Sequence, residues 1–130
     1  MTRNIEWDTF CDAVVPVILS NNLRAHSLAT RFQSEFGLAS VLCGAKKNIL
    51  DLFATDRSFL RLSVDDPRLA LEQLVDFSEQ WRECILVLVP VSDDDLAFIS
   101  QNRETLESRF LISENRRIDK LPINRPERWV

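Results

Sequence analysis

Short apolar runs alternate along the chain with longer amphipathic segments. The runs at residues 14–19, 40–43 and 85–91 are apolar without strict alternation, which is typical of strands covered on both faces. Residues 59–64 alternate apolar and polar side chains, which indicates a strand at the sheet edge with one solvated face. Residues 110–112 are a weaker candidate for a fifth strand.

Helical patterns occupy the segments between these strands. The predicted helices are residues 23–36, 67–82 and 93–109, with a short one at residues 48–53. Gly37 is expected to end the first of them, because glycine readily adopts the left-handed backbone of a helix C-terminus. Asp66 can cap the helix that Pro67 opens, since proline is favoured at the first helical position.

Strands that alternate with helices, and that are apolar throughout, predict a parallel sheet with helices on both faces. Right-handed crossovers then favour an α/β, three-layer Rossmann-like sheet of four to five strands, ordered 3-2-1-4 with the last strand outside strand 4. We expect this domain to span residues 14–121, after an N-terminal extension at residues 1–13. Residues 122–130 contain Pro122 and Pro126 and are interpreted as a linker or tail.

Charge and composition narrow the class of protein. The 130 residues carry a net charge of −4, so we expect no nucleic-acid partner. Residues 115–130 hold five basic and two acidic residues, a local charge of +3, interpreted as a solvated segment. No apolar run is long enough to cross a membrane, and Cys11, Cys43 and Cys84 lack the pattern of a disulfide framework. These features predict a cytoplasmic protein without a membrane partner.

The turn after the first strand reads Ser20-Asn21-Asn22. A dinucleotide fold needs glycines there so that the backbone can approach a pyrophosphate, and the chain has no P-loop motif. The remaining candidate is an anion or substrate contact at a helix N-terminus, aided by the two amides. The more conservative interpretation is that Asn21 or Asn22 caps the helix.

His26, the only histidine, is a candidate for the pocket above this turn. Its neighbour Ser27 points about 100° away on a helix, so the two do not form a nucleophile–base pair. The run Ser92 to Asp95 resembles a metal cluster, but a capping box in which Ser92 and Asp95 open a helix explains it better. Asp93 is retained as a candidate substrate contact, and we identify no catalytic, metal or cofactor residue.

Two segments resemble a known family. They are "VPVILSNNLRAHSLATRFQSEFGLASVLCG" and "LVLVPVSDDDLAFISQNRETLESRFLI". The first is similar to the start of ATP-grasp carboxylate–amine ligases of the D-aspartate ligase type, with His26 to Phe32 in the helix and Phe36-Gly37 closing it. The second is similar to the family's strand, "SDD" and helix. The family's Gly-Gly-Asp-like turn is replaced here by residues 20–22.

The resemblance implies a pre-ATP-grasp domain without catalytic residues of its own. Such a domain shapes the acceptor-substrate side of a cleft, and Ser20, Asn21, Asn22, His26 and Asp93 are the implied substrate contacts. ATP and Mg²⁺ would be cofactors of the full-length ligase, held by later domains. The implied partners are the missing ATP-grasp domain, in cis or in trans, and the small-molecule substrate of the parent enzyme.

Several interpretations stay open at the level of sequence. The chain is an excised domain, the product of an interrupted frame, or a product that works without a ligase partner. The principal alternative function is a stand-alone Rossmann-like interaction or regulatory module. An independent enzyme that uses Asp93, Asp94 and Asp95 with a metal is the least favoured.

Overall fold

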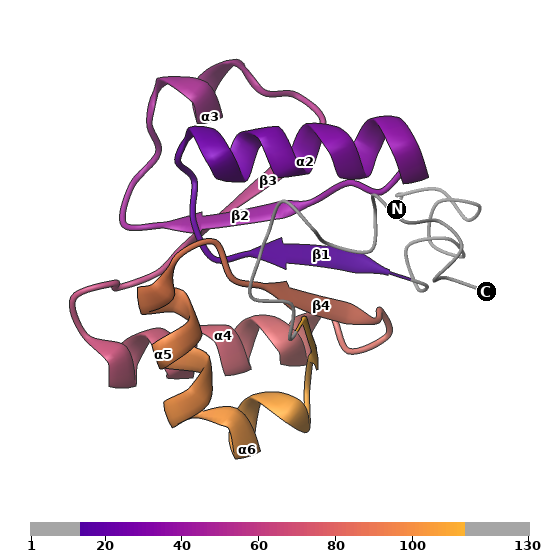
Figure 1. Cartoon of the computed structure of the whole chain (residues 1–130). Coiled ribbons are helices and arrows are strands. Elements are labelled where there is room, and N and C mark those ends of the chain that lie inside the picture. Colours follow the sequence, from indigo (N-terminus) through magenta and orange to yellow (C-terminus); the bar gives the residue numbers. More distant parts are fainter. Residues whose placement is uncertain (1–13, 114–130) are drawn as a thin grey trace.

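A computed structural model describes residues 14–113 of the chain. Its five-stranded sheet has the order β3-β2-β1-β4-β5, and all four strand pairs are parallel (Figure 1). The strands are listed here in chain order: β1 (Val15–Ile18), β2 (Val41–Gly44), β3 (Ser58–Arg61), β4 (Leu86–Val89) and β5 (Leu111–Ile112). The α/β class, the parallel pairing and the predicted strand order are confirmed.

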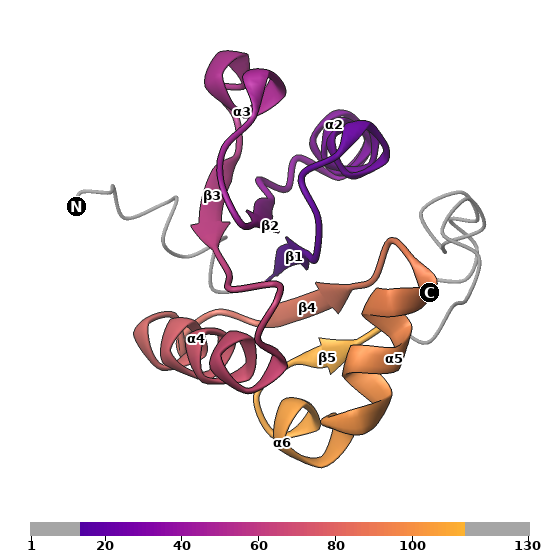
Figure 2. The ribbon, with the colours of Figure 1, turned by 90° about the vertical axis from the view of Figure 1, so that its left-hand side faces the viewer.

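The helices form two layers, one on each face of the sheet (Figures 1 and 2). They are listed in chain order: α2 (Leu23–Phe36), α3 (Ile49–Phe53), α4 (Pro67–Gln80), α5 (Asp93–Gln101) and α6 (Arg103–Glu107). On one face α2 packs on Ile18, Leu42 and Val89, while α4, α5 and α6 enclose the larger core on the other. Because both faces are covered, β1 and β2 are buried along their whole length, as their unbroken apolar runs predict.

Local signals place the helix ends correctly. Gly37 closes α2 with φ of 68°, and its backbone N–H donates to Gln33. The Asp66 side chain accepts from the backbone N–H of Leu69 and caps α4. The edge position of the 59–64 run is also confirmed, although β3 ends at Arg61 and the following residues form a loop.

The prediction of a single helix over residues 93–109 is wrong. The chain leaves the helix at Asn102, which has φ of −123° and ψ of 24° and separates α5 from α6. The Asn102 side-chain amide donates to the carbonyl of Phe98 at 2.9 Å. Asparagine side chains compete in this way with the helical backbone, a local preference that the apolar periodicity conceals.

Residues 1–13 and 114–130 lie outside the described residues. The predicted extension, the end of the predicted domain and the predicted tail fall there. Within the part of the chain that the structure describes, no helix has the length and apolar character needed to cross a membrane.

Candidate functional site

The carboxyl edge of the sheet is the natural place to look for a site. All five strands are parallel, so the loops that follow them gather along one edge. Strand order reverses between β1 and β4, which is where open α/β sheets bind their ligands. Figure 2 views this edge, with α3 at the top, α4 at the lower left and α5 at the right beside β4 and β5.

The turn at residues 20–22 is closed by bonds within the protein. The Asn22 side chain accepts from the backbone N–H of Ala25 at 2.8 Å and caps α2, so the capping interpretation is correct for this residue. The Ser20 hydroxyl accepts from the Asn22 backbone N–H at 3.2 Å. The Asn21 side-chain amide points across to the next loop, where it donates to the carbonyl of Lys46 at 2.9 Å.

Asp51 is the centre of this arrangement. Its side chain is only 4% exposed, and its carboxylate accepts from the Asn21 side chain at 2.6 Å, the Asn48 backbone N–H at 2.8 Å and His26 Nε2 at 2.8 Å. Asn48 in turn donates to the Asn21 carbonyl at 2.7 Å. Burial by itself raises the pKa of Asp51, but the hydrogen bonds from Asn48, Asn21 and His26 outweigh it and hold that pKa below its ordinary value.

His26 is buried under this network, and both of its ring nitrogens have partners. Nε2 lies 2.8 Å from Asp51, and Arg57 Nη1 lies 3.2 Å from Nδ1. Since a guanidinium only donates, Nδ1 accepts and Nε2 carries the proton donated to Asp51. Arg57 also donates to the His26 carbonyl and to Thr30, and it pairs with Asp56, whose pKa it lowers. Both ring nitrogens of His26 are therefore engaged in contacts that join α2 to α3 and to the loop that follows α3.

Gly44, at the end of β2, makes room for Asn21. A Cβ atom at this position would lie 2.6 Å from Asn21 Oδ1 and 2.8 Å from its Cγ. The absence of a side chain at Gly44 is therefore what lets the Asn21 amide reach the loop before α3. One of the two glycines in the chain thus serves contact between loops, whereas a phosphate loop would use glycine to expose backbone.

Helix α3 is inverted with respect to the usual surface helix. Its polar residue, Asp51, is buried, whereas Ile49, Leu52 and Phe53 are 66%, 68% and 78% exposed. Leu50 is also exposed, and no residue of α3 counts among the core. Surface helices normally bury their apolar face. This one is held by its carboxylate and presents its apolar side chains outward.

A cavity of about 560 Å³ opens at the same edge, on the other face of the sheet. Three loops and the start of two helices form it, and its lining includes Leu19, Leu62, Val64, Asp65, Asp94 and Phe98. Asp95 also lines it but is committed to the helix: its carboxylate accepts from the backbone of Val91 and Ser92 and completes the predicted capping box. Burial raises the pKa of Asp95, the bonds from Val91 and Ser92 oppose the shift, and the Asp94 charge adds to it.

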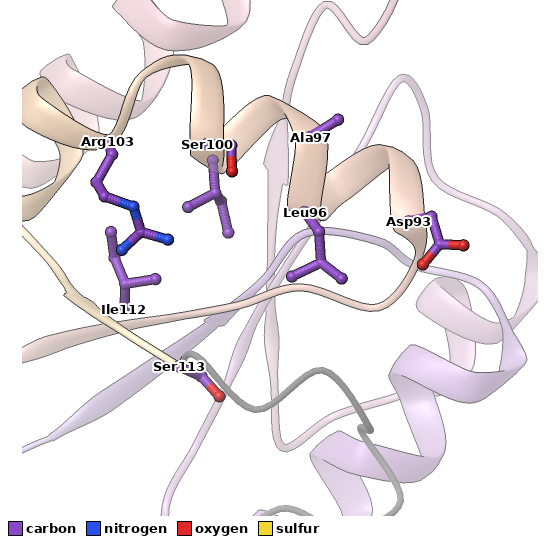
Figure 3. Close-up of a pocket in the computed structure, with 8 residues that line it drawn as sticks. Asp93, Leu96, Ala97, Ser100, Arg103, Ile112 and Ser113 are labelled. Carbon is purple, nitrogen blue, oxygen red and sulfur yellow. The ribbon is translucent and has the colours of Figure 1, made fainter.

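Asp93 lies apart from the other candidate residues. It borders a second cavity, of about 310 Å³, between α5 and the end of β5 (Figure 3). Asp93 and Arg103 stand toward opposite ends of this cavity, with Leu96 and Ser100 between them and Ile112 beside Arg103 (Figure 3). The five predicted contacts therefore do not form one site, because residues 20–22 and His26 lie in the turn before α2 and in the first turn of α2, whereas Asp93 opens α5.

The described residues hold no group of three or more His, Cys, Asp or Glu side chains placed to bind a metal. Cys43 is buried in the larger core, and burial raises the pKa of its thiol far above the ordinary value, so it is not a nucleophile. Cys84 is partly buried.

Asn48, Asp51, Arg57 and Gly44 are the residues of this edge that sequence reasoning missed. The spacing of Asn48 and Asp51 is that of a capping box, which both residues form reciprocally at the start of α3. That spacing was a signal for the helix start. Nothing in the sequence indicates that the same carboxylate also bonds to Asn21 and His26, which lie 30 and 25 residues away.

No protein-family model matches this chain. Neither the curated proteins nor the solved structures contain a match to it.

A substitution at Gly44 tests the contact with Asn21. Gly44→Ala should lower the free energy of unfolding by about 1–3 kcal/mol, because the new methyl group displaces the Asn21 amide from its partners. In an Asn21→Ala background the same change should be neutral or slightly stabilising, since alanine restricts the unfolded chain more than glycine does. Urea unfolding of the wild type, the two single variants and the double variant measures the coupling energy between Gly44 and Asn21. Equal effects of Gly44→Ala in both backgrounds would contradict the contact.

Acid should remove the contribution of the Asp51 carboxylate to the free energy of unfolding. Its pKa is lower folded than unfolded, so the stabilisation is complete above the unfolded value of about 3.9 and is lost as pH falls through the folded one. Asp51→Asn should therefore cost about 1.5–3 kcal/mol at neutral pH, the scale of charged hydrogen bonds, and less at pH 3 than at neutral pH. Urea unfolding at both pH values provides the check, with exposed Asp76→Asn as the control. An Asp51→Asn cost that does not change with pH would argue against the network.

Proposed function

We propose that this chain is the N-terminal, non-catalytic domain of an ATP-dependent carboxylate–amine ligase of the ATP-grasp type. In this proposal its carboxyl edge forms the acceptor-substrate wall of a cleft that an ATP-grasp domain, in cis or in trans, completes. The full ligase would use ATP and Mg²⁺ to activate a carboxylate, which an amine then attacks. The domain by itself neither hydrolyses ATP nor ligates a substrate.

The observation that carries this proposal is the apolar character of the carboxyl edge. Ten large apolar side chains are exposed in the described part of the chain, and seven of them lie at this edge. The seven are Leu23, Ile49, Leu50, Leu52, Phe53, Val64 and Leu69. Exposed apolar residues gathered on one face mark an interaction surface, and here that surface surrounds the position where α/β sheets bind ligands.

The bonding of the first turn gives further support. A phosphate-binding turn offers free backbone N–H groups to its ligand. In residues 20–22 the side chains instead cap α2 and connect this turn to the loop before α3 and to Asp51. A domain that binds no nucleotide at this turn but has an apolar carboxyl edge is better suited to forming one wall of a substrate cleft than to acting as an enzyme alone. The two matched segments of the family resemblance favour a ligase as the enzyme in question.

The second candidate function is a stand-alone interaction or regulatory module. The inverted helix α3 favours it, because an apolar face fixed outward by a buried carboxylate serves a protein contact whether or not a ligase is involved. The two functions differ in the partner that the edge contacts: an ATP-grasp domain for the ligase, and a different protein for the module. The DNA that follows the codon for Val130 separates them: a frame encoding an ATP-grasp domain favours the ligase, and unrelated sequence favours the module.

We place the protein in the cytoplasm as part of this proposal. The buried free thiol of Cys43 suits a reducing compartment, where the ATP and Mg²⁺ of the proposed ligase are also present.

Calorimetry with Mg-ATP tests the proposal on the chain itself. We expect no saturable, stoichiometric heat of binding, because residues 20–22 lack the glycines of a phosphate-binding loop. A parallel titration with inorganic phosphate tests the turn separately from the adenine and ribose. Stoichiometric binding of Mg-ATP that is lost in Asn22→Ala would place a nucleotide at this turn and overturn the proposal.

A further inference from the structure

The carboxyl edge carries two apolar patches with opposite charges around them. The first, here called the α3 patch, consists of Leu23, Ile49, Leu52 and Phe53 with the basic residues Arg24, Lys46 and Lys47, all exposed. The second, here called the acidic pocket, is the 560 Å³ cavity with Leu19, Val64 and Phe98 in its lining and Asp65 and Asp94 exposed beside them. We propose that two copies of this chain form a closed dimer in which each α3 patch enters the acidic pocket of the other copy.

Shape supports this pairing. Phe53 and Leu52 project from a helix that stands above the sheet, and their exposed fractions of 78% and 68% leave most of each side chain available to a partner (Figures 1 and 2). The pocket is open, has an apolar wall that includes Val64, and holds about 560 Å³. That volume accommodates large side chains of the kind that dominate binding energy at interfaces.

Charge supports it as well. The α3 patch has Lys46 and Lys47 directly before α3, while nearby Asp56 is already neutralised by Arg57 at 2.7 Å. The pocket is lined by Asp65, Asp94 and Asp95, and no lysine or arginine is among its lining residues. Arg68 follows in the first turn of α4, where exposed Asp66 precedes it. Opposite charges around two apolar surfaces give a complementary pair.

The geometry allows this contact to close on itself. Both patches lie at the carboxyl edge, the α3 patch on the α2 face of the sheet and the acidic pocket on the α4 and α5 face (Figure 2). A two-fold axis through the edge brings the patch of each copy to the pocket of the other, so the same contact is made twice. Such an isologous arrangement ends at a dimer and leaves neither patch exposed.

Other occupants fit these observations less well. Two α3 patches facing each other would oppose Lys46 and Lys47 to their own copies. An anionic membrane would attract the α3 patch but repel Asp65 and Asp94, which lie at the same edge of the sheet. The dimer goes beyond the proposed function and competes with it, because the two-fold contact and an ATP-grasp domain would use the same edge. The dimer is then a resting form that dissociates before a cleft is built.

Sedimentation velocity of the whole chain over a wide range of concentration gives the first test. We expect the mass to rise from 15.1 kDa toward twice that value and to stop there. A mass of 15.1 kDa at every concentration would overturn the dimer, and growth into larger species would overturn its closed symmetry. Either of these results would leave the ligase proposal in place, and the nucleotide titration tests that proposal separately.

A charge-reversal exchange tests which surfaces meet. The variant Lys46→Glu/Lys47→Glu and the variant Asp65→Lys/Asp94→Lys should each dimerise at least about tenfold more weakly than the wild type. Mixed together, they should form a heterodimer of nearly wild-type strength, because both contacts are then complementary again. A pocket variant that dimerises normally, or a mixture that stays monomeric, would reject the proposed pairing. Far-ultraviolet circular dichroism verifies that both variants are folded.

The apolar contact has a matched control. Phe53→Ser should weaken the dimer by about thirtyfold or more, as expected for a central aromatic anchor. Leu111→Ser removes a side chain that is 61% exposed on β5, away from the carboxyl edge, and should leave dimerisation unchanged. Equal effects of the two changes would overturn the assignment. Co-sedimentation with vesicles of phosphatidylserine and phosphatidylcholine completes the set, and wild-type binding that Phe53→Ser abolishes would favour a membrane as the occupant.

Discussion

The organisation of the carboxyl edge depends on one buried carboxylate. Asp51 accepts hydrogen bonds from two loops and from the first helix, so a single anion fixes the turn after β1, the start of α2 and the whole of α3. Leaving any of these donors unpaired would cost about 1–3 kcal/mol, which is why the loops adopt one arrangement. A helix of five residues has too few internal bonds to be stable alone, so α3 exists because its carboxylate is held.

As a result, the two faces of this edge expose different kinds of side chain. Beside α2, polar groups are turned inward and apolar groups outward; beside α4 and α5, carboxylates surround an apolar hollow. The first strand ends between these regions at Ile18, and Ser20 and Asn21 in the turn that follows use their side chains for hydrogen bonds within the protein. The edge therefore combines exposed apolar side chains on one face of the sheet with a cavity lined in part by carboxylates on the other.

Most of the fold follows from local signals in the sequence. Strand order, helix layers and the caps at Asn22, Asp66 and Ser92 were all predictable, because apolar periodicity and capping residues act over a few positions. Asn102 was not, since its own side chain breaks a helix that the periodicity continues. The site was predicted least well. The partners of His26 come from 25 and 31 residues along the chain, a separation over which sequence pattern carries no information about contact.

The position of β1 at the centre of the sheet has a consequence for how the protein is made. Its neighbours are β2, which follows after one helix, and β4, with which Val15 pairs at Leu86. While a ribosome is still producing the middle of the chain, one side of β1 has no strand to bond with and stays a template for any other extended segment. Newly made chains are therefore open to mispairing along β1 until β4 emerges.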